Sequence, residues 1–195
     1  HRRSLEVIET ATQDAAEIVR RIQTFARRAP SAQFNKISLA TLITDAVQLT
    51  RTSWEDDAYV HNLRYEVVFT NEAGTDDYIE ANATEVREVF VNLIFNALDA
   101  MPAGGRIELR EMKRDAWLVV EVRDTGEGIP PEFQDRIFEP FFTTKGSQGS
   151  GLGLAVSYGI IKRHGGTIEA GSAPGGTTFT LKFPHRQAFP ETSAG

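Results

Sequence analysis

Apolar residues recur with helical spacing over the first thirty residues of the chain. At alternating intervals of three and four residues, the series runs through Leu5, Ile8, Thr12, Ala15, Val19, Ile22 and Ala26. Such a heptad seam is typical of a helix that packs lengthwise against other helices. Pro30 is the first helix-breaking residue after it. We therefore predict one long helix over residues 2–29.

After this helix the pattern alternates between strands and helices. Amphipathic helices are predicted over residues 40–52, 84–101 and 152–163. Strands are predicted over residues 37–39, 63–70, 78–81, 106–112, 116–124, 167–171 and 177–183. The hairpins among them imply antiparallel pairing, with the helices covering one face of the sheet. The pattern thus indicates an α+β fold class for this part of the chain.

Residues 125–150 carry little regular pattern beyond a short helical piece at 132–137. A stretch of this length is uncommon inside a compact domain and is usually either a functional lid or disordered. We divide the chain into an N-terminal helix at residues 1–30, a mixed domain at 31–186 and a polar tail at 187–195.

Composition and charge exclude several classes of function. The chain has 195 residues, and 21 Lys and Arg against 27 Asp and Glu give a net charge of −6. An acidic chain is a poor binder of nucleic acid, so we expect no such partner. The absence of cysteine excludes disulfides, thiolate catalysis and cysteine zinc sites. The apolar runs are far shorter than the roughly 20 residues that cross a bilayer. We expect a cytoplasmic location, and a membrane anchor in a longer protein stays open.

The helix predicted at residues 84–101 combines a wide apolar face with one polar ridge. The apolar face comprises Val86, Val89, Phe90, Leu93, Ile94, Ala97, Leu98 and Met101. At roughly 100° per residue, four polar residues fall within about 80° of one another; they are Glu88, Asn92, Asn96 and Asp99. Buried amides need partners, and asparagine is a weak helix former. Asn92 and Asn96 therefore either satisfy nearby backbone groups or serve a ligand.

A second polar cluster follows the strand predicted at residues 116–124. Asp124 stands at the end of that strand, with Gly126 and Gly128 just after it. Glycines allow a ligand to approach the backbone closely, and a carboxylate accepts hydrogen bonds, for example from an exocyclic amine. An ordinary Asp-Thr-Gly turn is the alternative interpretation.

A glycine-rich segment opens the helix predicted at residues 152–163. It comprises Gly149, Ser150, Gly151, Leu152 and Gly153. Successive amides and the positive end of a helix dipole favour an anion such as a phosphate there. The spacing and context exclude the dinucleotide-binding and P-loop motifs.

Between the two glycine clusters, residues 138–145 read Phe-Glu-Pro-Phe-Phe-Thr-Thr-Lys. Three phenylalanines in a polar loop predict a lid that packs its rings at its base, or plain anchoring in the core. Lys145 either reaches a phosphate or stays solvated.

In order and spacing, these clusters resemble the boxes of the ATP-binding domain of sensor histidine kinases, within the GHKL superfamily of gyrase, MutL and heat-shock chaperone ATPases. Residues 88–99 resemble the N box, 124–128 the first glycine box, 138–142 the F box and 149–154 the second glycine box. The match runs from about residue 37 to 183. The N-terminal helix resembles the second helix of the dimerisation and histidine-phosphotransfer hairpin, two of which form a four-helix bundle.

The resemblance implies a two-layer α/β sandwich, the GHKL or Bergerat fold, with ATP held between the N-box helix and a mobile lid. Asn96 would coordinate Mg²⁺, Asn92 would contact the phosphates or a metal-bound water, and Asp124 would bond the adenine amine. Gly126 and Gly128 would let the backbone approach the base. The other nucleotide-binding residues implied are Ile129, Lys145, Gly149, Ser150, Gly151, Leu152 and Gly153. Asp99 departs from the pattern, because histidine kinases commonly carry Lys or Arg there.

The resemblance also bears on the reaction. ATPases of the superfamily place a glutamate one turn before the metal-binding asparagine as a general base. Here that residue is Asn92, whose amide cannot accept a proton, and Glu88 is expected to lie too far from the γ-phosphate. Transfer of the γ-phosphoryl group to a protein histidine is therefore implied. The resemblance also implies a response regulator as partner and a homodimer for the full-length protein.

The phosphoacceptor is implied on the first helix of the hairpin, which this chain lacks. We assign no acceptor role to His1, His61, His164 or His185, and we expect ATP binding without autophosphorylation. Two other interpretations stay open. One is a GHKL ATPase or an anti-sigma-type serine kinase, against which the N-terminal helix and Asn92 argue. The other is a nucleotide-binding regulatory module without phosphotransfer.

Overall fold

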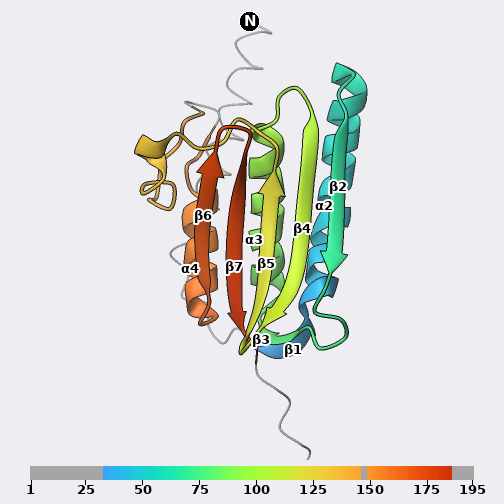
Figure 1. The fold of residues 1–195 in the computed structure, drawn as a ribbon, viewed down its shortest axis with the longest axis vertical. Coiled ribbons are helices and arrows are strands. Elements are labelled where there is room, and N and C mark those ends of the chain that lie inside the picture. The colour runs from blue at the N-terminus through green and yellow to red at the C-terminus, as the bar shows by residue number, and fades with distance from the viewer. Residues whose placement is uncertain (1–32, 146–148, 186–195) are drawn as a thin grey trace, which may run out of the picture.

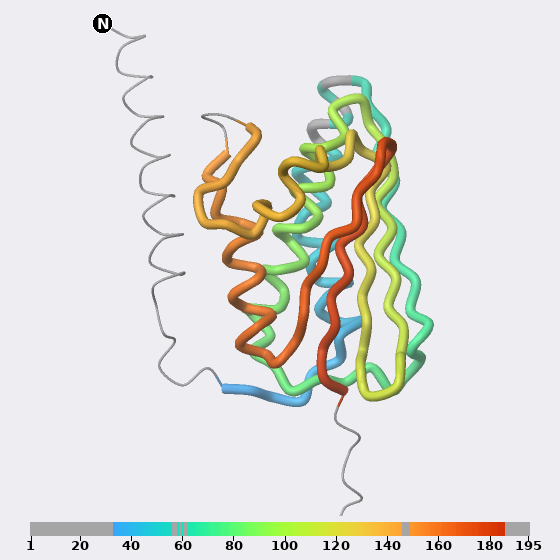
Figure 2. Tube along the Cα trace, turned by 60° about the vertical axis from the view of Figure 1, so that its left-hand side comes forward, coloured from blue at the N-terminus to red at the C-terminus, as the bar shows by residue number. Residues whose placement is uncertain are grey.

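The computed structural model describes residues 33–145 and 149–185, and it arranges them as a layer of helices packed on one face of a sheet (Figures 1 and 2). The helix predicted at residues 2–29 and the tail at 187–195 lie outside the described residues. In the part of the chain that the structure describes, no helix is both long and apolar enough to cross a membrane.

The main sheet has five strands in the order β2-β4-β5-β7-β6. Their bounds are β2 Tyr65–Asn71, β4 Gly105–Arg114, β5 Trp117–Asp124, β6 Thr167–Ala173 and β7 Gly176–Pro184. The pairs β4–β5, β5–β7 and β6–β7 are antiparallel, as predicted. The antiparallel prediction is wrong for β2 and β4, which run in parallel. A helix lies between these two strands in the chain. Such a crossover connection allows the second strand to run in the same direction as the first.

A second, two-stranded antiparallel sheet lies at one end of the domain (Figure 1). It pairs β1 (Asn35–Ser38) with β3 (Tyr78–Ala81). The strand predicted at residues 37–39 is shifted, because residue 39 already belongs to the following helix. The helical piece predicted at 132–137 shrinks to a single 3-10 turn, η1 (Pro131–Phe133). A pattern this short cannot offset the cost of nucleating an α-helix.

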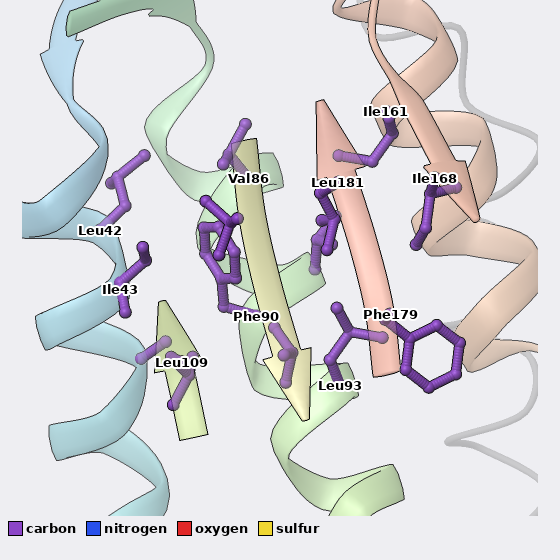
Figure 3. Close-up of a cluster of buried hydrophobic side chains, with 14 of the residues drawn as sticks. Leu42, Ile43, Val86, Phe90, Leu93, Leu109, Ile161, Ile168, Phe179 and Leu181 are labelled. Atoms are coloured by element: carbon purple, nitrogen blue, oxygen red, sulfur yellow. The ribbon is translucent and has the colours of Figure 1, made fainter. Parts of the chain in front are cut away.

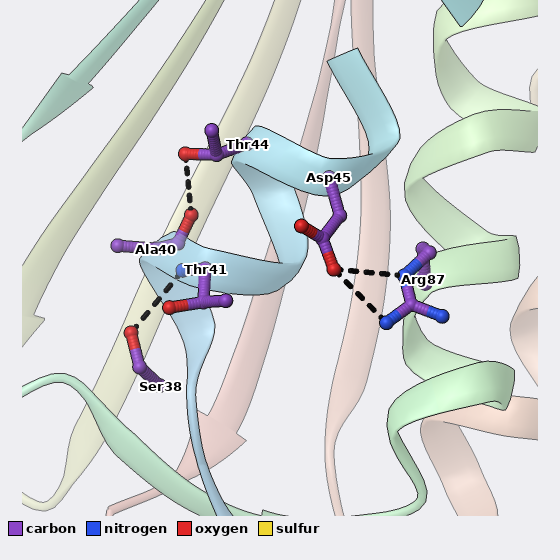
Figure 4. Close-up of polar contacts among 6 residues, drawn as sticks. All are labelled: Ser38, Ala40, Thr41, Thr44, Asp45 and Arg87. Carbon is purple, nitrogen blue, oxygen red and sulfur yellow. Dashed lines mark hydrogen bonds and ion pairs between the residues drawn. The ribbon is translucent and has the colours of Figure 1, made fainter. Parts of the chain in front are cut away.

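Three helices form the second layer: α2 (Leu39–His61), α3 (Ala83–Asp99) and α4 (Gly153–Arg163). Ser38 caps the start of α2, because its hydroxyl accepts a hydrogen bond from the backbone N–H of Thr41 (Figure 4). The helix continues well past the predicted end at residue 52, because no Gly or Pro interrupts it before Asn62 closes it in the left-handed conformation (φ 53°). Arg87 of α3 pairs with Asp45 of α2 at 3.0 Å (Figure 4).

The hydrophobic core fills the space between the two layers (Figure 3). α3 supplies its centre through the predicted apolar face, and Val86, Phe90 and Leu93 are fully buried there. Inward-facing strand residues such as Leu109 and Leu181 cover that face from the sheet side. Because these contacts fix the rotation of α3 about its axis, they also fix the direction of its polar ridge.

Candidate functional site

A cleft of about 590 Å³ opens at the end of the main sheet opposite the β1–β3 sheet. Its walls are the second half of α3, the start of α4 and the loop between β5 and α4. This loop, described over residues 125–145 and 149–152, is called the cleft loop below. Ten of the predicted site residues line the cleft: Asn92, Asn96, Asp124, Gly128, Ile129, Lys145, Gly149, Ser150, Gly151 and Gly153.

The polar ridge of α3 turns toward this cleft. Asn92, Asn96 and Asp99 line it, whereas Glu88, one turn before Asn92, is not among the lining residues. The amide nitrogen of Asn92 lies 3.5 Å from the hydroxyl of Ser157, a buried residue of α4. That contact joins two helices through side chains. The partner that the structure shows for this amide nitrogen is thus a side chain and not a backbone group.

Asp124 is the buried carboxylate of the cleft, with 3% of its surface exposed. One of its oxygens, Oδ1, accepts hydrogen bonds from the backbone N–H groups of Gly126 at 2.9 Å and Thr177 at 3.1 Å. Burial raises the pKa of the Asp124 carboxyl, and these two hydrogen bonds oppose the rise. The carboxyl group is thus held in one orientation at the wall of the cleft.

Two predicted nucleotide-binding residues are not part of the cleft lining. A Cβ added to Gly126 would lie 2.5 Å from the carbonyl oxygen of Ala100, so this glycine lets the chain pack against the end of α3. Leu152 is buried, with 1% exposure, just before α4. Packing of the protein against itself accounts for the surroundings of both residues, and the nucleotide contacts predicted for them stay predictions.

The three phenylalanines of the cleft loop have different surroundings. Phe138 packs against Tyr158 of α4, with ring centroids 5.5 Å apart. Phe142 packs against Phe133 at 5.4 Å. Phe141 instead is 63% exposed and has a positive φ of 68°. Anchoring of the loop by its aromatic rings is therefore confirmed for two of the three residues.

The second glycine cluster brings the start of α4 to the cleft. Gly151 has a positive φ of 63°, and a Cβ there would lie 2.4 Å from the carbonyl carbon of Phe141. The backbone N–H of Phe141 donates to the carbonyl of Gly151 at 2.9 Å, which joins the phenylalanine-rich part of the cleft loop to its last residues. Gly153 and Leu154, the first residues of α4, line the cleft. The first N–H groups of a helix lack intrahelical partners and carry partial positive charge, so this wall suits an anion.

Lys145 also lines the cleft. The sequence left open whether its ammonium contacts a phosphate or is solvated, and the structure shows a third environment. Its ammonium donates a hydrogen bond to Oδ2 of Asp99 at 2.5 Å. The ammonium is thus paired with the one residue of the N-box pattern that departs from the expected cation.

The sequence interpretation missed several lining residues, of which Thr177 and Phe179 on β7 are the most informative. They lie on the face of β7 that packs on the core, in the same alternating row as Leu181 and Phe183. A polar residue at the end of an inward-facing row is the signal that marks Thr177. Its N–H bond to Asp124 could not be anticipated, because it depends on the pairing of β5 with β7.

Comparison with known proteins agrees with this geometry. The family model "Histidine kinase-, DNA gyrase B-, and HSP90-like ATPase" matches residues 81–187. The chain belongs to this family. Sporulation kinase A of Bacillus subtilis (strain 168) is 43% identical over 110 residues, which cover 56% of this chain and 18% of that kinase. The signal transduction histidine-protein kinase AtoS of Escherichia coli (strain K12) is 33% identical over 187 residues, covering 94% and 29%.

Solved structures show the same likeness. The catalytic domain of histidine kinase ThkA matches with a TM-score of 0.66 and 32% identity, over 78% of this chain and 95% of that domain. ThkA in complex with the response regulator TrrA matches with a TM-score of 0.73 and 27% identity, over 94% of this chain and 51% of that kinase chain. The predicted sensor histidine kinase catalytic domain and its two-layer α/β sandwich are confirmed, and the domain is nucleotide-binding. The chain spans less than a third of the two curated kinases it was compared with above.

Proposed function

We propose that this domain binds ATP with Mg²⁺ and transfers the γ-phosphoryl group to a histidine of a dimerisation hairpin. The observation that carries the proposal is the convergence on one cleft of three chemically distinct walls. Asp124 supplies a buried carboxylate, and Asn92 and Asn96 supply amides from α3. The start of α4 supplies backbone N–H groups that have no partner within the helix. The carboxylate suits the nucleotide base, the amides suit phosphates that carry a metal ion, and the N–H groups of α4 suit phosphate oxygens.

Asp124 is the proposed contact for the exocyclic amine of adenine. Its fixed carboxylate accepts hydrogen bonds, and an amine donates them. Ile129 and Phe179 line the same cleft and offer apolar surface to the flat base. Selectivity for adenine over a base with a carbonyl at that position follows from this arrangement.

Asn96 is the proposed protein ligand for Mg²⁺. Among the described residues no group of three or more His, Cys, Asp or Glu is placed to hold a metal ion. The described part of the chain therefore shows no cage of its own, which is compatible with Mg²⁺, because that ion keeps several waters and takes phosphate oxygens with one or two protein oxygens. When bound, it would neutralise charge on the phosphates. Asn96 would orient them, and the start of α4 would add backbone N–H donors.

Transfer to a side chain, in preference to hydrolysis, rests on the residue that stands one turn before the proposed metal ligand on α3. The residue one turn before Asn96 is Asn92, and an amide is no general base for water. Glu88, the nearest carboxylate further back on α3, is not among the lining residues. Phosphoryl transfer needs positioning and charge neutralisation more than covalent help from the protein, so this cleft is sufficient once an acceptor is presented.

The proposed partners are a dimerisation hairpin, within a homodimer of a longer protein, and the receiver domain of a response regulator. The likeness to ThkA, solved with its response regulator, supports the second partner. Because ATP and receiver domains are cytoplasmic, we propose the same location for this domain.

The reaction is tested by mixing the chain with a separately produced acceptor hairpin and γ-labelled ATP. Acid-labile, alkali-stable label on a hairpin histidine is expected, together with slow release of inorganic phosphate from the chain alone. Rapid phosphate release with no labelled hairpin would favour an ATPase. Acid-stable label on a hydroxyl would favour a serine kinase.

The base contact is tested by comparing the affinities for ATP and inosine triphosphate, which lacks the exocyclic amine. We expect the parent chain to favour ATP at least ~10-fold, and Asp124→Ala to reduce this preference to near unity, because the hydrogen bond then has no acceptor. Thr178→Ala, a neighbouring change on the outer face of β7, is the matched control. An undiminished preference for ATP in Asp124→Ala would refute the contact.

A further inference from the structure

The ion pair between Lys145 and Asp99 joins the cleft loop to the last residue of α3. The ammonium Nζ of Lys145 lies 2.5 Å from Oδ2 of Asp99, and both side chains line the cleft. Each is partly exposed, at 40% and 55%. The backbone N–H of Lys145 donates to the hydroxyl of Thr143 at 3.1 Å, which fixes the chain direction just before the pair.

Without Lys145, the negative charge of Asp99 would be in an unfavourable place for two reasons. Asp99 ends α3, and no basic residue occurs in the last turn of that helix. A carboxylate at a helix C-terminus meets the negative end of the helix dipole. It also stands one turn beyond Asn96, on the wall where phosphates are proposed to bind, and like charges repel. The carboxylate therefore serves neither the helix nor a bound anion by its own charge.

We propose that Asp99 is a positioning residue that holds the ammonium of Lys145 at the phosphate end of the cleft. This inference rests on the proposed function. A lysine ammonium carries three N–H donors on a flexible stem, so Lys145 can keep one hydrogen bond to Asp99 and direct the others to phosphate oxygens. Asp99 limits where the ammonium lies, and the ammonium screens the Asp99 charge from the phosphates.

The pair is exposed enough to remain adjustable. Ion pairs between partly exposed side chains contribute little to the stability of the fold. Substitution of either residue is therefore compatible with a folded domain, and the consequence of each substitution should fall on nucleotide binding.

If the two residues are coupled in this way, the effect of Asp99→Asn on ATP affinity should have opposite signs with and without Lys145. With Lys145 present, Asp99→Asn releases the ammonium and should weaken ATP binding about threefold. With Lys145 replaced, as in Lys145→Met, the Asp99 carboxylate faces the phosphates without compensation. In that background Asp99→Asn should strengthen ATP binding about threefold, because it removes a repulsion.

The experiment is a calorimetric titration of the full chain and the variants Asp99→Asn, Lys145→Met and the double variant with Mg-ATP and with adenosine. Adenosine has no phosphates, so its affinity should stay the same in all four proteins. Asp45→Asn removes the same charge on α2, away from the cleft, and should leave ATP affinity unchanged. Thermal melting confirms that each variant is folded.

The outcomes separate this inference from the proposed function. A change of the same sign and size on Asp99→Asn in both backgrounds overturns the positioning role, while ATP binding by the parent chain keeps the proposed function. Equal losses for adenosine and ATP also overturn it, because the effect would then lie outside the phosphates. If the folded parent binds neither compound, the proposed function fails and this inference fails with it.

Discussion

The two ends of the domain use buried polar groups in opposite ways. At the end with the β1–β3 sheet, the side chains of His164 and Asp77 are hydrogen-bonded to other groups of the protein. His164 accepts the backbone N–H of Asn82 at 3.1 Å and donates from its other ring nitrogen to the carbonyl of Ile160 at 2.8 Å. Asp77 there accepts hydrogen bonds from Ser38 and from the backbone of Ala40, at the start of α2.

At the cleft end, polar groups are held by the protein but face the cleft. Asp124 is fixed through one oxygen by two backbone N–H groups, and the amide nitrogen of Asn92 contacts the hydroxyl of Ser157 in α4. Asn96 and Lys145 line the same cleft. Closed polar networks stabilise the fold, whereas polar groups that are fixed and directed into a cleft are available to a ligand. This difference separates the functional end from the structural end, and three predictions test it.

The largest effect is expected at the cleft. Asn96→Ala removes the proposed metal ligand, and phosphotransfer to an added hairpin should fall at least ~100-fold. Because Asn96 is a partly buried polar residue at the cleft and is not among the buried side chains of the core, the melting temperature should stay close to that of the parent. Single-turnover transfer with γ-labelled ATP measures the first, and circular dichroism melting measures the second. A fully active Asn96→Ala protein would remove this residue from the site.

A second prediction concerns a buried carboxyl at the opposite end. Glu111 of β4 has no exposed surface, and neither of its carboxyl oxygens has a hydrogen-bond partner among the described residues. Burial, with a smaller contribution from the nearby Asp77 charge, raises the pKa of Glu111 to about 8. Between its ordinary pKa and this value, the folded protein binds more protons than the unfolded chain. The free energy of unfolding therefore falls as pH rises from about 5 to 8.

Glu111→Gln should remove this dependence, because the amide carries no proton to titrate. The parent should lose stability relative to the variant by up to ~1.4 kcal/mol per pH unit within that range. Urea unfolding of both proteins at pH 5, 6, 7 and 8 measures the difference. Parallel stability curves for the two proteins would show that the carboxyl titrates normally.

The smallest effect is expected at the start of α3. The side chain of Asn82 caps this helix by accepting the N–H of Glu85 at 3.1 Å. Asn82→Ala should lower the free energy of unfolding by ~1 kcal/mol, since it removes one helix cap. ATP affinity should not change, because the cap lies at the end opposite the cleft. Weaker ATP binding with unaltered stability would contradict the division between the two ends.

Much of the fold was accessible from the sequence because it depends on local patterns. The apolar face of α3 appears as predicted, and so do the hairpins β4–β5 and β6–β7. The parallel pairing of β2 with β4 was not accessible, because it joins segments separated by a helix. The full length of α2 was underestimated, since a run of weak helix formers without Gly or Pro does not mark where a helix ends.

The sequence by itself determined the residue types of the site, their order and the face of α3 that carries the polar ridge. These follow from helical periodicity and from motifs of fixed spacing, which are local properties of the chain. Tertiary structure alone decided that Gly126 serves packing against Ala100, that Thr177 fixes Asp124 and that Lys145 pairs with Asp99. Each of these contacts joins residues that are 26 or more positions apart in the chain. They come together only when packing of the core aligns α3, the cleft loop and β7.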